Sequence, residues 1–464
     1  MPPNVIVFFT DQQRWDTTGL HGNPMGLTPN FDRLASEGTH VFNCCTSQPV
    51  CGPARSSLQT GMYASNTGVP TNGCVPDDGL KGLAHYFTEA GYGTGYIGKW
   101  HLSDCQAVPQ KHRMGYEYWL ASNALEATSN AYATKMYDKD NQPVRLPGYR
   151  VDALTDAAVR YIDEQNERPD PFFLFLSFLE PHFQNHIDSY PAPVGYEDEC
   201  RRNLWVPPDL QALSGSTYRH LAGYYGMCRR LDEALGRIFD ALISLEIEEE
   251  TIILFTSDHG CHFKTRNSEY KRSCHEGSVR IPTFLHGPGL TGGGPLRNQV
   301  SLVDLPPTLL DAAGLDIPPQ MEGRSILPLV RGEDADWPEE AFIQISESHC
   351  GRALRTERWK YEVSAPETNP RAVHGECFEE AFLYDLHSDP YELCNLIEEP
   401  SHDGVCEYLR HRLTERMVRA GEPKPEIAPH PRRAGGKRRV SSREVNSTDP
   451  YLSRQIIPEE VDRS

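Results

Sequence analysis

The sequence contains no apolar run long enough to cross a membrane. Its most apolar stretches are residues 5–9 and 172–179, whereas a transmembrane helix needs about 20 such residues. The first stretch is also too short for the apolar core of a signal peptide, and no cleavage pattern follows it. We therefore expect no membrane partner and a cytoplasmic location, unless an export signal has been removed.

Cysteines with the regular spacing of a disulfide framework are also missing. The 13 cysteines are odd in number and scattered, and the adjacent Cys44 and Cys45 are poorly placed for regular pairing. This usage is typical of proteins from a reducing compartment. It favours the same cytoplasmic location.

Positive charge is in deficit. Lys and Arg number 45 against 65 Asp and Glu, which gives a formal net charge of -20. Such a chain is unsuited to nucleic acid or to an anionic membrane surface as a general partner. An anionic substrate would need a local cluster of cations, or a metal ion, to overcome the overall field.

The 464 residues are enough for more than one domain. We predict an α/β domain over residues 1–338 and a smaller α+β domain over 339–420. The boundary is placed in the acidic, Pro-containing stretch 334–340. Residues 421–464 are rich in Pro, Arg and Lys and are predicted to form an extended tail.

Apolar runs predict the strands of a mostly parallel sheet. Residues 5–9, 172–179 and 251–255 are almost wholly apolar, as expected of strands buried on both faces, and a fourth strand is expected at 92–97. Helical patterns are found at residues 29–38, after Pro53, and at 80–90, 151–167, 217–245 and 303–313. Residues 123–149 and 186–215 have no clean period and are expected to be surface excursions. The smaller domain is predicted to contain strands at 341–345, 352–363 and 382–386 and a helix at 405–419.

Acidic and amide side chains directly follow two of these strands. Asp11 and Gln12 come after the first strand, and Asp258 and His259 follow the strand at 251–255. Ligands gather outside the carboxyl ends of parallel strands, and hard oxygen ligands suit Ca²⁺ or Mg²⁺. Either aspartate alone is as readily a turn or helix cap. The two together favour a divalent-cation site.

Basic side chains occupy similar positions. Lys99 and His101 come after the fourth strand, His182 after the most apolar one, and Lys271 lies in a later loop. A single Lys or His is usually solvated or structural. Together, however, these residues supply hydrogen-bond donors for the oxygens of an anion, and histidine exchanges protons near neutral pH.

The most specific pattern surrounds Cys51. Residues 49–63 read Pro-Val-Cys-Gly-Pro-Ala-Arg-Ser-Ser-Leu-Gln-Thr-Gly-Met-Tyr. A lone cysteine is usually a small buried hydrophobe, but this stretch resembles the signature of the sulfatase family, in which the cysteine is oxidised after translation to formylglycine. Further segments resemble that family, so that the likeness covers residues 3–420: Gly-Lys-Trp-His at 98–101, Lys-x-x-x-x-Glu-Gly at 271–277, and residues 383–396.

The resemblance implies a fold and a cofactor. The fold is the alkaline-phosphatase-like α/β fold, with a large mostly parallel sheet flanked by helices and a smaller C-terminal antiparallel sheet and helix. The cofactor is one divalent metal ion, Ca²⁺ first and Mg²⁺ or Mn²⁺ as alternatives, at the positions of Asp11, Gln12, Cys51, Asp258 and His259. Many relatives carry Asp in place of Gln12 and Asn in place of His259, so this ligand set has one negative charge fewer and a softer donor.

The resemblance also implies a nucleophile and its helpers. Cys51, converted to formylglycine, would act as a hydrated aldehyde, with one hydroxyl to attack sulfur and one to expel the product. Arg55 would orient this hydrate. Lys99, Lys271 and His182 would neutralise the sulfate oxygens, with His182 or Lys271 protonating the leaving alkoxide and His101 taking the last proton.

The expected substrate is a sulfated small molecule or oligosaccharide. Five basic residues are candidates for contacts with the rest of the substrate, although each is as readily ordinary polar surface, and they would suit an anionic sugar such as a uronate: Arg14, His186, His262, Lys264 and Arg266. The expected protein partner is a formylglycine-generating or sulfatase-maturating enzyme. A homo-oligomer formed through the basic tail is compatible with the sequence.

Two other functions also fit the sequence. A hydrolase of phosphonate monoesters or phosphodiesters can carry the same Cys-Gly-Pro-Ala-Arg core, because phosphoryl transfer needs the same electrostatics. Ala54, where many sulfatases have Ser, is consistent with that branch, whereas Lys99 and His101 favour a sulfatase. The third possibility is a protein that binds sulfated ligands and in which Cys51 is never converted.

Overall fold

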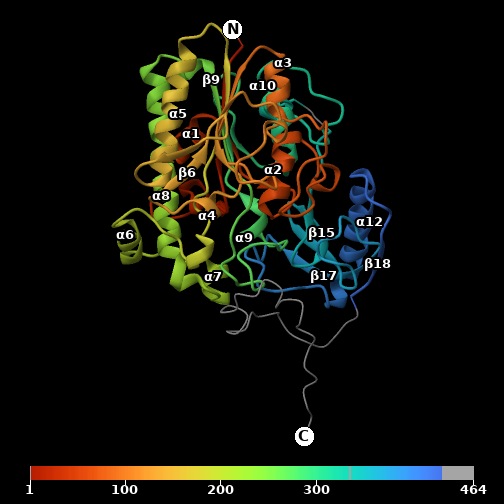
Figure 1. Ribbon diagram of the computed structural model, residues 1–464. Helices are drawn as coiled ribbons and strands as arrows, with labels where there is room; N and C mark the ends of the chain where they lie inside the picture. The colour runs from red at the N-terminus through yellow and green to blue at the C-terminus, as the bar shows by residue number, and fades with distance from the viewer. Residues whose placement is uncertain (1, 334–335, 431–464) are drawn as a thin grey trace.

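The structure is a computed structural model that describes residues 2–333 and 336–430 (Figure 1). Within these residues, ten strands form one mixed sheet. In spatial order they are β12 (Gly294–Leu296), β2 (Thr39–Val41), β11 (Phe284–His286), β9 (Thr251–Ser257), β1 (Asn4–Thr10), β8 (Phe172–Ser177), β4 (Gly93–Lys99), β5 (Tyr118–Ser122), β6 (Thr134–Tyr137) and β7 (Pro143–Leu146). β1 lies between β8 and β9 and is parallel to both, which confirms the predicted parallel arrangement of the three apolar runs.

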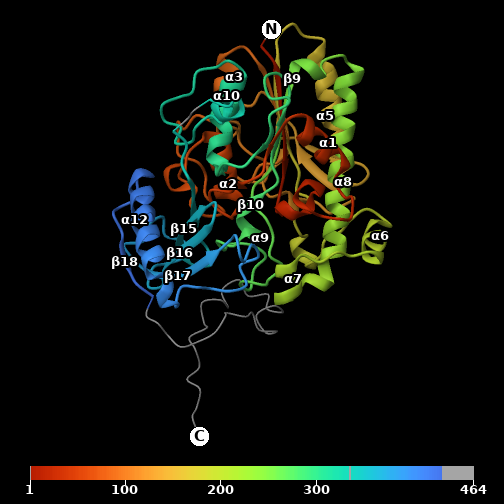
Figure 2. The ribbon, with the colours of Figure 1, turned by 180° about the vertical axis from the view of Figure 1, so that it is seen from behind.

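Alternate residues of β1 enter two separate cores. Val5, Val7 and Phe9 belong to the core that includes α2 (Cys51–Thr60), α3 (Leu83–Glu89) and α10 (Leu305–Ala312). Ile6 and Phe8 belong to the core that includes α1 (Pro29–Glu37), α5 (Arg150–Asn166) and α8 (Thr217–Ser244). Figures 1 and 2 show these two groups of helices on opposite faces of the sheet. The sheet is therefore covered on both sides, as a run of consecutive apolar residues predicts.

Residues 123–149 differ from the prediction of a surface excursion. They contain α4 (Leu125–Thr128), and their strands β6 and β7 extend the main sheet in antiparallel fashion. Each strand has only four residues, too few for the alternation of buried and exposed side chains to stand out in the sequence. The second predicted excursion, 186–215, contains two short helices, α6 (Tyr196–Arg202) and α7 (Pro208–Leu213).

A five-stranded sheet lies in the C-terminal part of the chain. Its strands, in order, are β14 (Glu340–Ile345), β15 (Cys350–Thr356), β16 (Trp359–Ala365), β17 (Cys377–Asp385) and β18 (Glu426–Ala428). The first four are antiparallel, and α12 (Asp403–Arg419) packs its apolar side chains into the same core. The run 352–363, predicted as one strand, is divided between β15 and β16 by a reversal of the chain. β18 falls in the predicted tail and pairs parallel to β17, and residues 431–464 of that tail lie outside the described residues.

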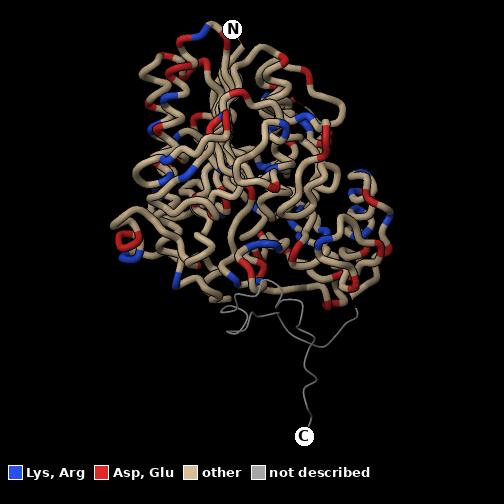
Figure 3. The backbone as a smooth tube through the Cα atoms, in the orientation of Figure 1, with Lys and Arg blue, Asp and Glu red and all other residues tan. Residues whose placement is uncertain are grey.

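Three further short strands form a small sheet beside the main one: β10 (Arg280–Ile281), β3 (Cys44–Cys45) and β13 (Val300–Ser301). Cys44 and Cys45 are thus buried strand residues, and the cysteines of the chain are all free thiols in the described residues. In the view of Figure 3, acidic and basic residues are interspersed along the outer helices and loops. Among residues 2–333 and 336–430, no helix is both long and apolar enough to cross a membrane.

Candidate active site

The carboxyl ends of four parallel strands meet at one edge of the main sheet. Thr10 of β1 lies beside Ser257 of β9, and Gly98 of β4 lies beside Ser177 of β8. The polar residues that end or follow these strands are therefore brought together from distant parts of the sequence, as expected for ligands of an α/β sheet.

Cys51 lies at this edge as the first residue of α2. The helix was predicted to begin after Pro53, but it begins at Cys51 and has Pro53 in its first turn. Proline is tolerated there because the N–H group that it lacks has no partner within the helix at that position. Cys51 is 1% exposed, and the positive end of the helix dipole favours negative charge on its side chain.

Four buried side chains form a potential metal site. The ligand atoms of Asp11, Cys51, Asp258 and His259 all lie within 4.8 Å of one another. The Nδ1 atom of His259 donates to the carbonyl oxygen of Gly260 at 2.9 Å, so its Nε2 is the ring nitrogen that faces the cluster, where it lies 3.0 Å from Lys271 Nζ.

Gln12 and Asp258 contribute two further oxygens without hydrogen-bond partners. The amide nitrogen of Gln12 donates to Tyr190 at 3.0 Å, whereas its Oε1 is buried and accepts no hydrogen bond. The Oδ2 atom of Asp258 is likewise buried without a hydrogen bond, and the Nε atom of Arg55 lies 3.5 Å away from it. Buried polar atoms are nearly always paired, and these carboxylate, amide and imidazole donors fit a divalent cation.

The two carboxylates have different electrostatic environments. Burial and the Cys51 thiolate raise the pKa of Asp11, but Lys99, His182 and Arg55 outweigh them, and its pKa is lowered. The nearest of these contacts is Lys99 Nζ, 2.7 Å from Asp11 Oδ2. Burial and the neighbouring Asp11 raise the pKa of Asp258 to about 6. A cation between them would favour the ionised form of both.

Basic side chains surround the sulfur atom of Cys51. Lys271 Nζ lies 2.7 Å and His259 Nε2 3.2 Å from Cys51 Sγ. Burial raises the pKa of the Cys51 thiol, but Lys271, Lys99 and His259 together lower it well below its usual value, and a hydrogen bond from His101 acts in the same direction. The thiol position is therefore built to hold negative charge.

His182 and Arg55 complete this cluster. His182 Nε2 is 3.4 Å from Lys271 Nζ, and its Nδ1 donates to the carbonyl oxygen of Phe183 at 2.6 Å. Arg55 donates to Asp11 Oδ2 at 2.9 Å and to Ser177 Oγ at 2.8 Å. The structure thus brings together all ten residues predicted as catalytic or metal-binding, from four strand ends, one helix and one loop.

Backbone strain occurs at two of these positions. Gln12 has a φ of 68° and His101 a φ of 66°, in the left-handed region that non-glycine residues seldom adopt. Each follows the end of a sheet strand. Strain of this kind persists where surrounding contacts hold the chain, and it clusters at functional sites.

Two of the five predicted substrate contacts lie in the protein interior. Arg14 is 1% exposed, and its guanidinium pairs with Asp16 at 2.7 Å and with Asp209 at 3.0 Å. His262 is also buried, with its Nε2 3.0 Å from the carbonyl oxygen of Lys271. Burial lowers the pKa of His262 to about 3. The environment of both residues is that of a packed core.

Lys264 is also buried, at 7% exposed, whereas Arg266 is half-buried and His186 is exposed. Lys264 lies 3.7 Å from Asp188, and Arg266 donates to the carbonyl oxygen of Tyr391 at 2.9 Å. His186 lines a cavity of about 550 Å³. The five residues therefore do not form one basic surface.

Glu126 is a neighbour of the cluster that the sequence did not reveal. It belongs to α4, just beyond the end of β5, and its Oε1 is 3.0 Å from Lys99 Nζ. It also lines the same cavity as His186. Its position shortly after a strand of the parallel sheet is the same signal that identified Asp11, but its segment has no clean pattern.

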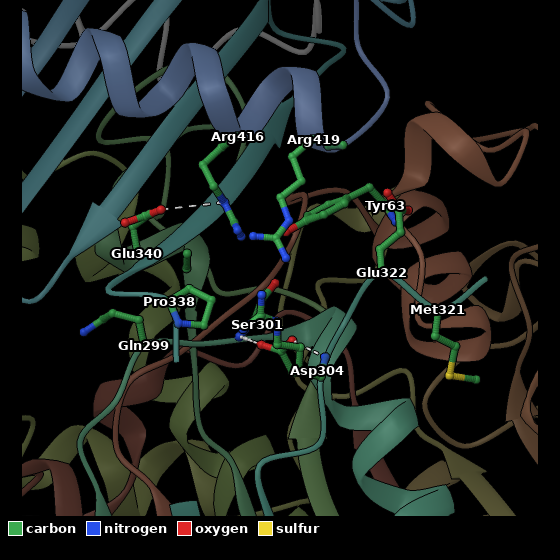
Figure 4. A pocket seen from close by; sticks show the side chains of 13 residues that line it. Tyr63, Gln299, Ser301, Asp304, Met321, Glu322, Pro338, Glu340, Arg416 and Arg419 are labelled. Atoms are coloured by element: carbon green, nitrogen blue, oxygen red, sulfur yellow. Dashed lines mark hydrogen bonds and ion pairs between the residues drawn. The ribbon is translucent and has the colours of Figure 1, made fainter. Parts of the chain in front are cut away.

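A separate cavity of about 230 Å³ lies between α12 and the chain around β13. Figure 4 shows Arg416 and Arg419 extending from α12 toward Ser301 and Asp304. The lining of this cavity also includes Tyr63, which lies just after the C-terminal end of α2, whereas Cys51 is at the N-terminal end. None of the predicted site residues lines it.

This fold and this group of side chains define a hydrolase of anionic esters. The chain belongs to the sulfatase family, a family of sulfuric ester hydrolases: the family model described as "Sulfatase" matches residues 3–315. A second model, described as "N-sulphoglucosamine sulphohydrolase, C-terminal", matches residues 268–419.

Curated relatives cover most of the chain. The ulvan-active sulfatase of Formosa agariphila is 30% identical and spans 90% of this chain and 82% of its own. The N-acetylglucosamine-6-O-sulfatase of Bacteroides thetaiotaomicron is 23% identical and spans 91% of this chain and 88% of its own.

Solved structures confirm the predicted fold. A Bacteroides fragilis protein described as a sulfatase, yidJ, superposes with a TM-score of 0.80 at 25% identity, over 91% of this chain and 96% of its own. The phosphonate monoester hydrolase of Agrobacterium radiobacter superposes with a TM-score of 0.66 at 23% identity, over 90% and 96%. The second likeness concerns the fold alone.

Proposed function

We propose that this chain hydrolyses the sulfate ester of a carbohydrate through a formylglycine made from Cys51. The observation that carries the proposal is the position of Cys51 at the buried start of α2, where Lys271 Nζ lies 2.7 Å from its sulfur and the other potential metal ligands lie within 4.8 Å of it. The likeness to an ulvan-active sulfatase and to an N-acetylglucosamine-6-O-sulfatase supports a sugar as the alcohol.

The proposed metal is Ca²⁺, with Mg²⁺ and Mn²⁺ as alternatives. Asp11, Gln12, Asp258, His259 and residue 51 would hold it, since their oxygen and nitrogen donors converge. When bound, a divalent cation supplies positive charge that acidifies a hydroxyl and polarises a sulfate oxygen. The uncharged Gln12 leaves the site less negative than three carboxylates would.

The cations of the chain would bind and orient the ester. Lys99, Lys271 and His182 converge on the space beside Cys51 and would donate hydrogen bonds to the sulfate oxygens. Each such donor is worth on the order of 3 kcal/mol in a transition state. Arg55, held by Asp11 and Ser177, would keep residue 51 in line with the sulfur.

Proton transfers would occur in both steps of the reaction. In the first step one hydroxyl of hydrated residue 51 loses its proton to solvent, and its oxygen bonds to sulfur while the bond from sulfur to the alcohol oxygen breaks. His182 or Lys271 gives a proton to the departing alcohol oxygen. In the second, His101 takes the proton of the remaining hydroxyl, the carbon–oxygen bond to sulfate breaks, and the aldehyde returns. Addition of water restores the hydrate.

A mass spectrum of the peptide that contains Cys51 tests the nucleophile. We expect the mass of a CHO group in place of CH₂SH after coexpression with a formylglycine-generating or sulfatase-maturating enzyme, the proposed partner. Cys51→Ala should abolish turnover of 4-nitrophenyl sulfate, whereas Cys105→Ala, at an exposed cysteine, should not. Full activity of the Cys51 variant would refute the covalent mechanism. Tight binding of sulfate esters without turnover would instead identify a binding protein.

The second candidate is hydrolysis of phosphonate monoesters or phosphodiesters. Ala54, within the Cys-Gly-Pro-Ala-Arg core, and the shared fold favour it. The two candidates are separated by kcat/KM for an aryl sulfate and for the matching aryl phosphonate monoester, measured on one preparation. We expect the sulfate to be the better substrate, and faster cleavage of the phosphonate would reverse the assignment.

A further inference from the structure

A cavity lies next to Glu126, the residue that pairs with Lys99 of the cluster at Cys51. It has a volume of about 550 Å³ and is lined by Glu126, Ala127, Thr128, Ser129, Asn130, Asn185 and His186. Its size falls within the roughly 300–1,000 Å³ of small-molecule sites. Its lining combines apolar surface with hydroxyl, amide, imidazole and carboxylate groups, a mixture that suits a hydroxylated ring.

Glu126 connects this cavity to the catalytic cluster. Its Oε1 is 3.0 Å from Lys99 Nζ, which is itself 2.7 Å from Asp11 Oδ2. The side chain of Glu126 is 8% exposed, and its Oε2 is buried without any hydrogen-bond partner. The ion pair with Lys99 thus occupies one oxygen of the carboxylate and leaves the other unsatisfied, an arrangement that costs stability unless a ligand supplies a donor.

The carboxylate is held in place and ionised. Gln184, which follows β8, donates from its side chain to the carbonyl oxygens of Glu126 at 2.7 Å and of Ser129 at 3.0 Å. Burial opposes ionisation of Glu126, but Lys99, His101 and His182 outweigh it and lower its pKa to about 2. A fixed negative charge therefore borders the cavity at neutral pH.

We propose that Glu126 selects the alcohol half of the ester, by accepting a hydrogen bond from a hydroxyl or ammonium group on the carbon next to the one that bears the sulfate. The inference rests on the proposed function, in which Lys99 holds a sulfate oxygen. Because Glu126 lies 3.0 Å from Lys99, a group that reaches it must be close to the ester. The same charge repels a second sulfate or a carboxylate at that carbon, so the preferred sugar is not a uronate sulfated beside its acid group.

Matched small esters test this selection. The probes are cyclohexyl sulfate, trans-2-hydroxycyclohexyl sulfate and the bis-sulfate of trans-1,2-cyclohexanediol, with 4-nitrophenyl sulfate as the reference, and the measured quantity is kcat/KM. In the wild-type enzyme we expect the hydroxy ester to exceed cyclohexyl sulfate roughly 10- to 100-fold, as a hydrogen bond to a charged group predicts. The bis-sulfate should be the poorest substrate.

The variant Glu126→Gln keeps the shape of the side chain and removes its charge. We expect it to lose at least about 10-fold of the preference for the hydroxy ester and to accept the bis-sulfate better relative to cyclohexyl sulfate. Glu117→Gln, at an exposed carboxylate before β5, should keep the wild-type ratios. Ratios between substrates are informative here. A loss that acts only through Lys99 lowers kcat/KM for every substrate by the same factor and leaves the ratios unchanged.

The outcomes separate the two proposals. A wild-type enzyme without a hydroxyl preference, or a Glu126→Gln enzyme with an unchanged preference, overturns the inference while turnover of 4-nitrophenyl sulfate leaves the proposed function standing. No turnover of any sulfate ester by the matured wild-type enzyme overturns both. Should Glu126→Gln fail to fold, Glu126→Asp and the wild-type ratios decide the matter.

Discussion

Lys360 Nζ donates a hydrogen bond to the carbonyl oxygen of Cys274 at 2.7 Å and so ties β16 to the loop that carries Lys271. The same nitrogen lies 2.8 Å from Glu276 Oε1 and 3.0 Å from Glu392 Oε1, and all three side chains are buried. The C-terminal sheet therefore holds the loop from which Lys271 reaches the sulfur of Cys51.

Lys360→Met should weaken both folding and activity. It leaves Glu276 and Glu392 buried with one cation fewer, and loss of one partner of a buried pair costs about 3–5 kcal/mol of unfolding free energy. Lys271 would then be less firmly placed, so kcat should fall more than KM rises. Urea unfolding and steady-state kinetics measure the two effects. Lys81→Met, which removes an exposed pair with Glu89, should change neither appreciably. An active, fully stable Lys360→Met protein would contradict this role.

Arg55→Lys should lower kcat/KM by roughly 100-fold, because an ammonium group cannot reproduce the fork of a guanidinium and a misplacement of about 1 Å at the reacting group costs on the order of 100-fold. Arg55 donates at once to Asp11, to Ser177 and to the carbonyl oxygen of Lys99. The comparison is Arg33→Lys on the exposed face of α1, which should retain wild-type kinetics. Equal kinetics for the two variants would show that the fork is not needed.

Removal of divalent metal should abolish activity without unfolding the protein. After dialysis against a chelator, we expect turnover of an aryl sulfate to return with Ca²⁺ and, less completely, with Mg²⁺ or Mn²⁺. Asp258→Asn should lower the affinity for the metal ion by at least the roughly 10- to 100-fold that loss of an outer-shell partner costs. Asp140→Asn, at an exposed position, serves as its control. Full turnover in chelator would argue against a metal.

His40 should make the protein less stable in acid. Burial, Arg280 and Arg297 lower its pKa from 6.5 to about 4. Below pH 6.5 the unfolded chain takes up a proton that the folded protein excludes, so the unfolding free energy falls as pH drops from 6.5 to 4, by at most about 3 kcal/mol. Above pH 6.5 both states are neutral and the effect vanishes.

The pH dependence is measured by urea unfolding between pH 4 and 7. His40→Asn should show a shallower loss in acid than the wild type, whereas His411→Asn, at an exposed histidine of α12, should follow the wild-type curve. Parallel curves for wild type and His40→Asn would exclude this origin.

Parts of the site follow directly from the sequence because each depends on a local pattern. Asp11 and Asp258 come immediately after apolar strands, and parallel strands place such residues at one edge. The start of α2 was predicted too late because proline was read as a boundary, although a first turn accommodates it. The potential metal cluster of four buried side chains was thus predicted in its members and in its place.

Other parts depend on contacts that leave no local pattern. The pair Glu126 and Lys99 joins a four-residue helix to a strand end, and Glu126 lies in a segment without a period. Lys360 and Cys274 are separated by 86 residues. A salt bridge or hydrogen bond of this kind is fixed by tertiary packing, and only the folded chain reveals it.

The central position of β1 means that the main sheet cannot be completed until much of the chain has been synthesised. β1 pairs with β8 and β9, which follow it in the chain. Lys271 is synthesised 220 residues after Cys51. At about 5–20 residues per second, synthesis of that interval takes roughly 10–40 s. Because Cys51 is 1% exposed once folded, the maturing enzyme proposed above would have to reach it before the sheet forms around it.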